Sequence, residues 1–411
     1  MGSKYKRLVA RGRIAAIPVV AAAAITGGIV GVSSASAKKV GSVAGAAVSK
    51  STLATLKAYV ADQQAAPAWI APGPAVNAKK ALRGKTIVTF PISSFIDACN
   101  LKGQQGYLDA EAQKLGAKVD ALNSTPGGPP NWQANLQQAI TDKASAVVML
   151  CGEPASLLTT QLTALQAHHI PVVDGNYNQI AGNKVFPFTG LSAESGVDTA
   201  GGVKTDLAQA LINLHGKAAH ILFLNSQSVA QYAGATQALK KAMAAWCKSC
   251  SIVKEEDFAT TLPWGPAETP TITSDLQANP SINTVIVTFD GMSDSIESAV
   301  SSAAATHPGL KMYAWGGGLA EIKAIQNGGT YAGDSGPNEK WDAYNQLDQV
   351  IRLLAHKPAV NVTKEVAPNM FFTKSNAATF SVGGKGQAYS DKPYSNGAFV
   401  QDYLRLWEVT K

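Results

Sequence analysis

The stretch KTIVTFPISSF (residues 85–95) decides the architecture of this chain. Its run IVTF has the length and composition of a buried β-strand, with a basic lead-in before it and Pro91 after it. Two small hydroxyl side chains, Ser93 and Ser94, and the ring of Phe95 follow the run. Hydroxyls and an aromatic face at the end of a buried strand predict a polar binding surface, provided that other strand ends meet there.

The residues that follow repeat this pattern. Stretches with apolar residues on one helical face, such as YLDAEAQKLGA (residues 107–117), alternate with the short runs KVDAL, AVVML and IPVVD. Continuous apolar runs separated by helices indicate parallel strands that are buried on both faces. Because crossovers between parallel strands are right-handed, the predicted fold is a doubly wound, Rossmann-like α/β sheet.

The same pattern then starts again. The runs HILFLN, SIVKEEDF, TVIVTFD and KMYAWGGG (residues 220–225, 251–258, 284–290 and 311–318) are separated by further helical stretches. Two wound sheets in one chain predict two lobes, each with its own core. We assign residues 84–190 to lobe 1, with a return segment at about residues 337–372, and residues 191–336 to lobe 2.

The segments outside the lobes differ in composition. Residues 38–83 are rich in Ala, Ser and Pro, contain one short helical pattern at residues 51–64, and predict a leader or linker that rests on the folded part. Residues 373–411 end in the helix-like GAFVQDYLRLWEV and predict a tail that packs on the lobes.

The net charge of +7 is concentrated at the start of the chain. Five basic residues and no acidic ones lie in residues 1–37, which leaves +2 for the rest. A nucleic-acid partner is therefore not expected. The basic head, the apolar run at residues 14–32 and the small-residue end Ala35-Ser36-Ala37 predict a secretory signal peptide cleaved before Lys38. A retained membrane anchor is the alternative. We expect the mature protein to be secreted or extracytoplasmic.

Four cysteines in an exported chain suggest disulfides. Cys247 and Cys250, in WCKSC, close a helical stretch, whereas a redox-active pair opens one, so a small structural disulfide is expected. Cys99 and Cys151 each follow a predicted strand in the same lobe, and a bridge between them is the second expectation. We expect no metal site, since no further ligands are suitably spaced from either WCKSC or the adjacent His168-His169 pair.

Several phrases together resemble a known family. They are TFPISSF after the first strand, WQANLQQAITDKASAVVML, LQAHHIPVVDGN, and LQANPSINTVIVTFDGMSDSIESAV followed by KMYAWGGG. Their order is similar to the type I periplasmic binding proteins, in particular the ribose- and galactose-binding group that serves sugar ABC importers. The resemblance implies two lobes joined by three crossing strands, a ligand held between them by hinge closure, and delivery to an ABC permease. We expect a monomer.

The carboxyl ends of the strands supply the expected ligand contacts. The candidate ligand-binding residues in chain order are Ser93, Ser94, Phe95, Glu153, Asp174, Asn176, Gln227, Asp290, Trp315 and Asn338. Asp290 has a second interpretation, as a residue that only caps the helix after it.

This chain departs from the sugar-binding pattern at three strand ends. Such binders commonly carry an Asp where this chain reads WGGG, and arginines where it reads DGNYN and SQSVAQY. The resemblance implies a sugar or polyol as the ligand, and these departures leave a less hydroxylated or aromatic molecule as the alternative.

Other functional classes have less support. The dinucleotide motif GxGxxG does not follow the first strand, and the phosphate loop GxxxxGK[ST] does not occur, so neither an enzyme nor a bound cofactor is expected. An extracellular ligand-sensing module remains the alternative to transport, because docking surfaces carry no local motif. A structural surface protein would be favoured by repeats, and none are found.

Overall fold

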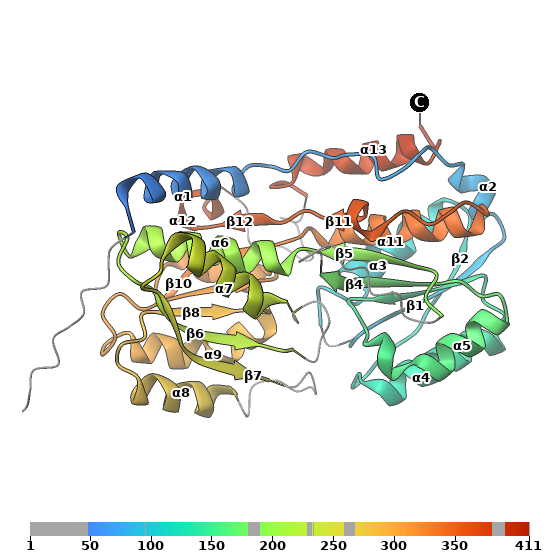
Figure 1. The fold of residues 1–411 in the computed structure, drawn as a ribbon. Coiled ribbons are helices and arrows are strands. Elements are labelled where there is room, and N and C mark those ends of the chain that lie inside the picture. The colour runs from blue at the N-terminus through green and yellow to red at the C-terminus, as the bar shows by residue number, and fades with distance from the viewer. Residues whose placement is uncertain are drawn as a thin grey trace, which may run out of the picture. The chain divides into compact units, whose positions relative to one another are not determined.

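Two β-sheets of mainly parallel strands form the framework of the protein (Figure 1). The computed structural model describes residues 48–94, 96–179, 190–227, 232, 234–258, 268–379 and 391–410, with only the backbone of residues 176–179. The expected signal peptide, residues 1–37, lies outside the described residues, as does Phe95. In the part that is described, no helix has both the length and the apolar character needed to cross a membrane.

Sheet A forms the core of lobe 1 and has the strand order β11-β5-β4-β3-β1-β2. The strands are β1 (Thr86–Pro91), β2 (Lys118–Ala121), β3 (Ala146–Leu150), β4 (Val172–Gln179), β5 (Ala193–Val197) and β11 (Val366–Ala367). The helices of this lobe are α3 (Gln104–Lys114), α4 (Pro129–Thr141), the short η1 (Ala155–Leu157), α5 (Thr159–Ala167), α11 (Glu339–Leu354) and η2 (Val362–Lys364).

Apolar side chains alternate between the two faces of sheet A. Val147 and Met149 of β3 join the core under α4 and α5, and Val148 joins the core on the side of α3 and α11. All of these side chains are fully buried. This is why the run AVVML is apolar throughout instead of alternating with polar residues.

Sheet B forms the core of lobe 2, in the order β12-β10-β9-β8-β6-β7. Its strands are β6 (His220–Asn225), β7 (Ser251–Asp257), β8 (Thr284–Val287), β9 (Lys311–Trp315), β10 (Tyr331–Gly336) and the antiparallel β12 (Met370–Phe372). Its helices are α6 (Thr199–Asn213), α7 (Ala235–Trp246), α8 (Glu268–Ala278), α9 (Asp290–Ala303), α10 (Leu319–Asn327) and α12 (Lys374–Ala377).

Three connections between the sheets occur in the described part of the chain. Strand β5 leads into α6, β10 leads into α11, and β11 leads into β12. Each connection leaves the carboxyl end of a strand. Because β12 runs antiparallel to β10, with Met370 opposite Gly336, the third connection also arrives at the carboxyl edge of sheet B. The connections therefore join the carboxyl edges of the two sheets, and the predicted two-lobed α/β fold is confirmed.

The pairing of two strands shifts the lobe boundaries from those expected. Strand β5 hydrogen-bonds to β4, so lobe 1 extends past residue 190 to Val197. Strand β12 lies in the expected return segment but pairs with β10, so it belongs to lobe 2. Both strands are short, and their partners, not their own side chains, decide which sheet they join.

The segments at the two ends pack on the lobes. Helix α1 (Lys50–Gln63) buries Leu56 and Val60 in the core that also holds Leu207 of α6. Helix α2 (Ala78–Leu82) lies against α11, as does α13 (Ala398–Leu406), which follows the short η3 (Ser395–Gly397). The Trp407 indole donates to a carboxylate oxygen of Asp348 over 2.7 Å. The described part of the expected leader is thus built into the folded unit.

Candidate functional site

The loop after β1 is tied to a neighbouring loop by its two serines. The Ser93 hydroxyl donates to the carbonyl oxygen of Pro126 (3.3 Å), and the hydroxyl of Ser94 accepts from the backbone N–H of Ser124 (2.9 Å). Ser93 is fully buried. Both hydroxyls therefore have partners within the protein, and they hold the shape of this strand end.

A disulfide links the same loop to the end of β3. Cys99 and Cys151 are bonded, with their Cα atoms 5.8 Å apart. Cys151 and Gly152 both have positive φ angles, 71° and 80°, so the chain turns sharply after β3. Glu153 follows this turn and lies near Asp174 at the carboxyl edge of sheet A. The second pair, Cys247 and Cys250, is also bonded and lies between α7 and β7, away from this edge.

Acidic side chains are buried at the carboxyl edge of sheet A. Glu153 and Asp174 are fully buried, and among the described residues none of their four carboxyl oxygens finds a hydrogen-bond partner. Burial raises the pKa of both groups well above its usual value, and for Asp174 the nearby Glu153 and Glu194 raise it further. Asp174 and Glu194 are opposite each other in the β4–β5 register, so they share a face of the sheet. The side chain of Asn176 lies outside the described residues.

At the end of β6 the predicted residue Gln227 lies on the surface. Its backbone N–H donates to Asp257 (2.8 Å), and its side-chain amide lies 3.5 Å from a carboxylate oxygen of Glu255. The neighbouring Asn225 is buried and accepts from the Ser226 N–H over 2.8 Å. Gln227 is therefore positioned by the end of β7 and keeps an exposed side chain.

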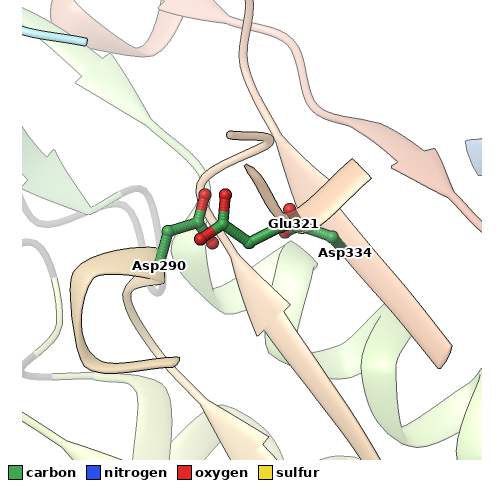
Figure 2. A group of neighbouring side chains, drawn as sticks. All are labelled: Asp290, Glu321 and Asp334. Atoms are coloured by element: carbon green, nitrogen blue, oxygen red, sulfur yellow. The ribbon is translucent and has the colours of Figure 1, made fainter. Parts of the chain in front are cut away.

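Asp290 belongs to a group of three carboxyl groups in lobe 2 (Figure 2). The other two are Glu321 of α10 and Asp334 of β10, and one oxygen from each of the three lies within 4.8 Å of the others. Burial, with the Asp290 and Asp294 carboxyls nearby, raises the pKa of Glu321 to about 10. Burial also raises the pKa of Asp290 and of Asp334 well above the usual value.

A pKa of about 10 means that the Glu321 carboxyl is protonated at neutral pH. Asp206 of α6 is also buried, and no described residue hydrogen-bonds to its carboxyl group. Its charge contributes to the raised pKa of Asp334. Three carboxylate oxygens at this spacing are ligands that a hard cation prefers. Protonation also stabilises these carboxyl groups without a cation. Burying an unpaired carboxylate is unfavourable, whereas the neutral acid can donate a hydrogen bond to a neighbouring carboxyl oxygen.

The glycines of WGGG leave space for the carboxyl groups of Asp290 and Glu321. A Cβ on Gly316 would lie 2.2 Å from an oxygen of Asp290, and a Cβ on Gly318 would lie 2.1 Å from an oxygen of Glu321. The Gly318 N–H donates to Asp290 over 2.8 Å. The absence of the Asp expected here in sugar binders thus has a steric reason: the carboxyl groups enter from α9, α10 and β10 instead.

Trp315 lies in an aromatic group at the carboxyl edge of sheet B. The Tyr232 ring is 6.2 Å from Trp315 and 6.0 Å from Phe289, measured between centroids. The Trp315 indole donates to Asn369 (3.2 Å), whose amide in turn donates to the Asp198 carbonyl over 2.6 Å. Asn369 lies in the third connection and Asp198 in the first, so Trp315 is held against both.

Asn338 begins α11, in the second connection between the sheets. Its side-chain oxygen accepts from the Trp341 N–H over 2.8 Å and caps the helix. Its amide nitrogen is buried and has no hydrogen-bond partner in the part of the chain that the structure describes. One end of this side chain is thus occupied by the helix, and the other end retains unused donors.

The structure distributes the predicted residues over two edges that the three connections join. The lobe 1 set is Ser93, Ser94, Glu153 and Asp174, and the lobe 2 set is Gln227, Asp290 and Trp315, with Asn338 in a connection. Sequence reasoning missed Glu321 and Asp334. Glu321 lies in α10, a helix that was not predicted. Asp334 lies in β10, whose sequence YAGDSG is not an apolar run.

Comparisons with known proteins agree with this architecture. Residues 94–358 match the family described as periplasmic binding protein domain. No match was found among curated proteins. Among solved structures, an ABC sugar transporter subunit from Rhodobacter sphaeroides 2.4.1 is similar at 18% identity and a TM-score of 0.60, over 72% of this chain and 99% of that chain.

Two further structures were solved with ligands. An ABC transporter solute binding protein from Agrobacterium vitis, with bound allitol, has 18% identity and a TM-score of 0.57, over 72% of this chain and 98% of that chain. One from Bacillus halodurans C-125, with bound myo-inositol, has 12% identity and a TM-score of 0.58, over 72% of this chain and 97% of that chain. At these identities the likeness shows a common fold. The family match covers more than half of the sequence, and the chain therefore belongs to the periplasmic binding protein domain family, whose members bind solutes and are not enzymes.

Proposed function

We propose that this protein is an exported solute receptor that captures a small polar molecule, a sugar or polyol, between its lobes and delivers it to an ABC importer in the membrane. The observation that carries the proposal is that all three connections join the carboxyl edges of the two sheets. Ligands of wound sheets bind at such edges, and hinged lobes can close around them. The predicted signal peptide at residues 1–37 supports export.

The ligand class is supported by two kinds of observation. Solved structures of similar fold contain allitol and myo-inositol. At the edge itself, Gln227 is exposed and Asn338 keeps an unused amide donor, and both groups suit the hydroxyls of a polyol. We place Gln227, Asn338 and Trp315 in the ligand contact, together with the predicted residues Phe95 and Asn176.

One observation favours a second candidate, a less hydroxylated or aromatic ligand. Tyr232, Phe289 and Trp315 gather at the lobe 2 edge, and the segments DGNYN and SQSVAQY contain no arginine to bind several hydroxyls. Aromatic side chains offer apolar faces to a planar ring. The ligand panel below therefore includes nucleosides and aromatic acids.

A thermal-shift screen of the chain from Lys38 onward tests the proposal. The panel contains pentoses, hexoses, allitol, myo-inositol, nucleosides and aromatic acids. A ligand at one hundred times its Kd should add about 2.7 kcal/mol to the free energy of unfolding and raise Tm. If no member of the panel raises Tm, the proposed solute binding is refuted.

Matched variants locate the binding site once a ligand is found. Gln227→Ala should raise its Kd about tenfold, the loss expected for hydrogen bonds to one side chain. Gln137→Ala, an exposed glutamine on α4, is the control and should leave Kd unchanged. Deletion of the gene should abolish uptake of that ligand. Normal uptake, with a lost response to the ligand, would instead establish the sensing role.

A further inference from the structure

A cavity of about 560 Å³ lies in lobe 2, at the edge of sheet B opposite the candidate ligand site. Its walls include Lys311 and Tyr331, the first residues of β9 and β10, whereas the candidate site lies at the carboxyl ends of those strands. The remaining walls come from α1, α6, the end of α10, and α12. The volume is within the range of small-molecule sites, roughly 300–1,000 Å³.

The charged groups in the walls of this cavity are all positive. Lys57, Lys311 and Lys374 line it, and no Asp or Glu does. In the described part of the chain, none of the three lysines forms an ion pair with a carboxylate. Three like charges around one hollow create a positive potential that attracts an anion.

Two of the ammonium groups converge on one turn. The Lys311 Nζ donates to the carbonyl oxygen of Gly329 over 2.6 Å. A Cβ built on Gly328 would lie 3.3 Å from the Lys374 Nζ, so that ammonium group reaches the adjacent residue of the same turn. Carbonyl groups at the end of α10 stabilise cations there. The Gly329 carbonyl holds the Lys311 ammonium group in place without neutralising its charge.

The other walls are ordered and partly apolar. The Gln64 amide donates to the Thr373 hydroxyl over 2.7 Å and joins α1 to the start of α12. Val60, Ile212 and Ile325 also line the cavity. A ligand with an anionic group and an apolar part would match both kinds of surface.

We propose that this cavity binds a small organic anion, a phosphate ester or carboxylate whose charged group contacts Lys311 and Lys374 and whose apolar part faces Val60 and Ile325. The site is separate from the one between the lobes and does not depend on the function proposed above. Its α1 wall comes from residues before 94, where the family match begins.

Isothermal titration calorimetry of the chain from Lys38 onward, in low-salt buffer, tests this site. The probes are phenyl phosphate, phenylacetate, inorganic phosphate and benzyl alcohol, which separate the charge from the apolar part. Phenyl phosphate or phenylacetate should bind, inorganic phosphate more weakly, and uncharged benzyl alcohol not at all. Added salt should weaken the binding, because these lysines are partly or fully exposed.

The double variant Lys57→Ala/Lys374→Ala should raise the Kd of the bound probe about tenfold, through loss of the Lys374 contact and of the positive charge of Lys57 at the cavity wall. Both side chains are exposed, so the fold should persist, and circular dichroism checks this. Lys323→Ala, an exposed lysine of α10 that does not line the cavity, is the control and should leave Kd unchanged. The proposal is overturned if neither organic anion binds at millimolar concentration, if the double variant binds as tightly as the parent, or if a ligand of the site between the lobes displaces the anion competitively.

Discussion

Replacing Glu321 by glutamine should stabilise this protein at neutral pH. Glu321 is 3% exposed, and burial among other carboxyl groups raises its pKa from 4.5 to about 10. In the unfolded chain the same group ionises above pH 4.5. The folded state therefore binds more protons than the unfolded state between pH 4.5 and about 10, and the free energy of unfolding falls as pH rises through this range.

The magnitude follows from the width of that range. Each pH unit above 4.5 lowers the free energy of unfolding by about 1.4 kcal/mol until the Glu321 carboxyl of the folded protein ionises. For Glu321 alone the cost reaches about 3 kcal/mol at pH 7, as an upper value because the neighbouring carboxyl groups titrate with it. Glutamine has the same shape, does not ionise, and can donate its amide hydrogens to the unpaired oxygens of Asp290 and Asp334. At low pH the two side chains should be nearly equivalent.

Thermal melting of the parent and of Glu321→Gln between pH 5 and pH 8 measures this difference. The Tm of the variant should exceed that of the parent by about 4 °C at pH 7, from the usual unfolding entropy per residue. The gap should narrow towards pH 5. Glu408→Gln, at an exposed position near the end of the chain, is the control and should melt like the parent at every pH.

Two results would contradict the reasoning. A gap in Tm that does not change with pH would show that Glu321 does not titrate within the predicted range. A variant that melts below the parent, together with a parent whose Tm falls on addition of EDTA, would show that the three carboxylates hold a divalent cation and are not protonated.

Two further predictions concern the connections and the disulfide. Asn338→Ala should lower the free energy of unfolding by about 1 kcal/mol, because it removes the cap of α11. Asn338→Asp should keep the cap and weaken ligand binding. An unchanged Kd in the Asp variant would leave Asn338 with the capping role alone. Changing Cys99 and Cys151 together to serine should lower the free energy of unfolding by about 2–4 kcal/mol, because the bridge closes a long loop across 52 residues, and an unaltered melting curve under non-reducing conditions would disprove this.

The two wound sheets could be predicted from local sequence. Buried runs such as AVVML and ILFL must be apolar throughout, because helices cover both of their faces. The helices between them show one apolar face. These patterns repeat in order along the chain, so the number of lobes and the positions of most strand ends follow without knowledge of any contact.

Strands β5 and β10 could not be predicted from an apolar run in this way. Their sequences, AESGV and YAGDSG, are mostly small or polar, and they form strands because neighbouring strands offer them backbone hydrogen bonds. Backbone pairing with a neighbour is a property of the sheet and leaves little trace in side-chain composition. The lobe boundary, which depends on β5, was therefore placed too early.

The strand ends that carry the candidate residues could be predicted, and the contacts of those residues could not. Strand ends could be identified from sequence, and with them Gln227, Asp290 and Trp315. Whether a side chain at a strand end meets solvent, a neighbouring loop or another carboxyl group depends on residues far away in the chain. The serines after β1 proved to be bound to the loop that contains Ser124 and Pro126.

Sequence alone determined the apolar cores of this protein, because hydrophobic periodicity is a local property that each strand and helix must satisfy by itself. Only the tertiary structure brought Asp290, Glu321 and Asp334 together and showed that the glycines after β9 leave space for them. The physical reason is that burial and charge coupling arise between elements distant in sequence, where no local pattern records their distance.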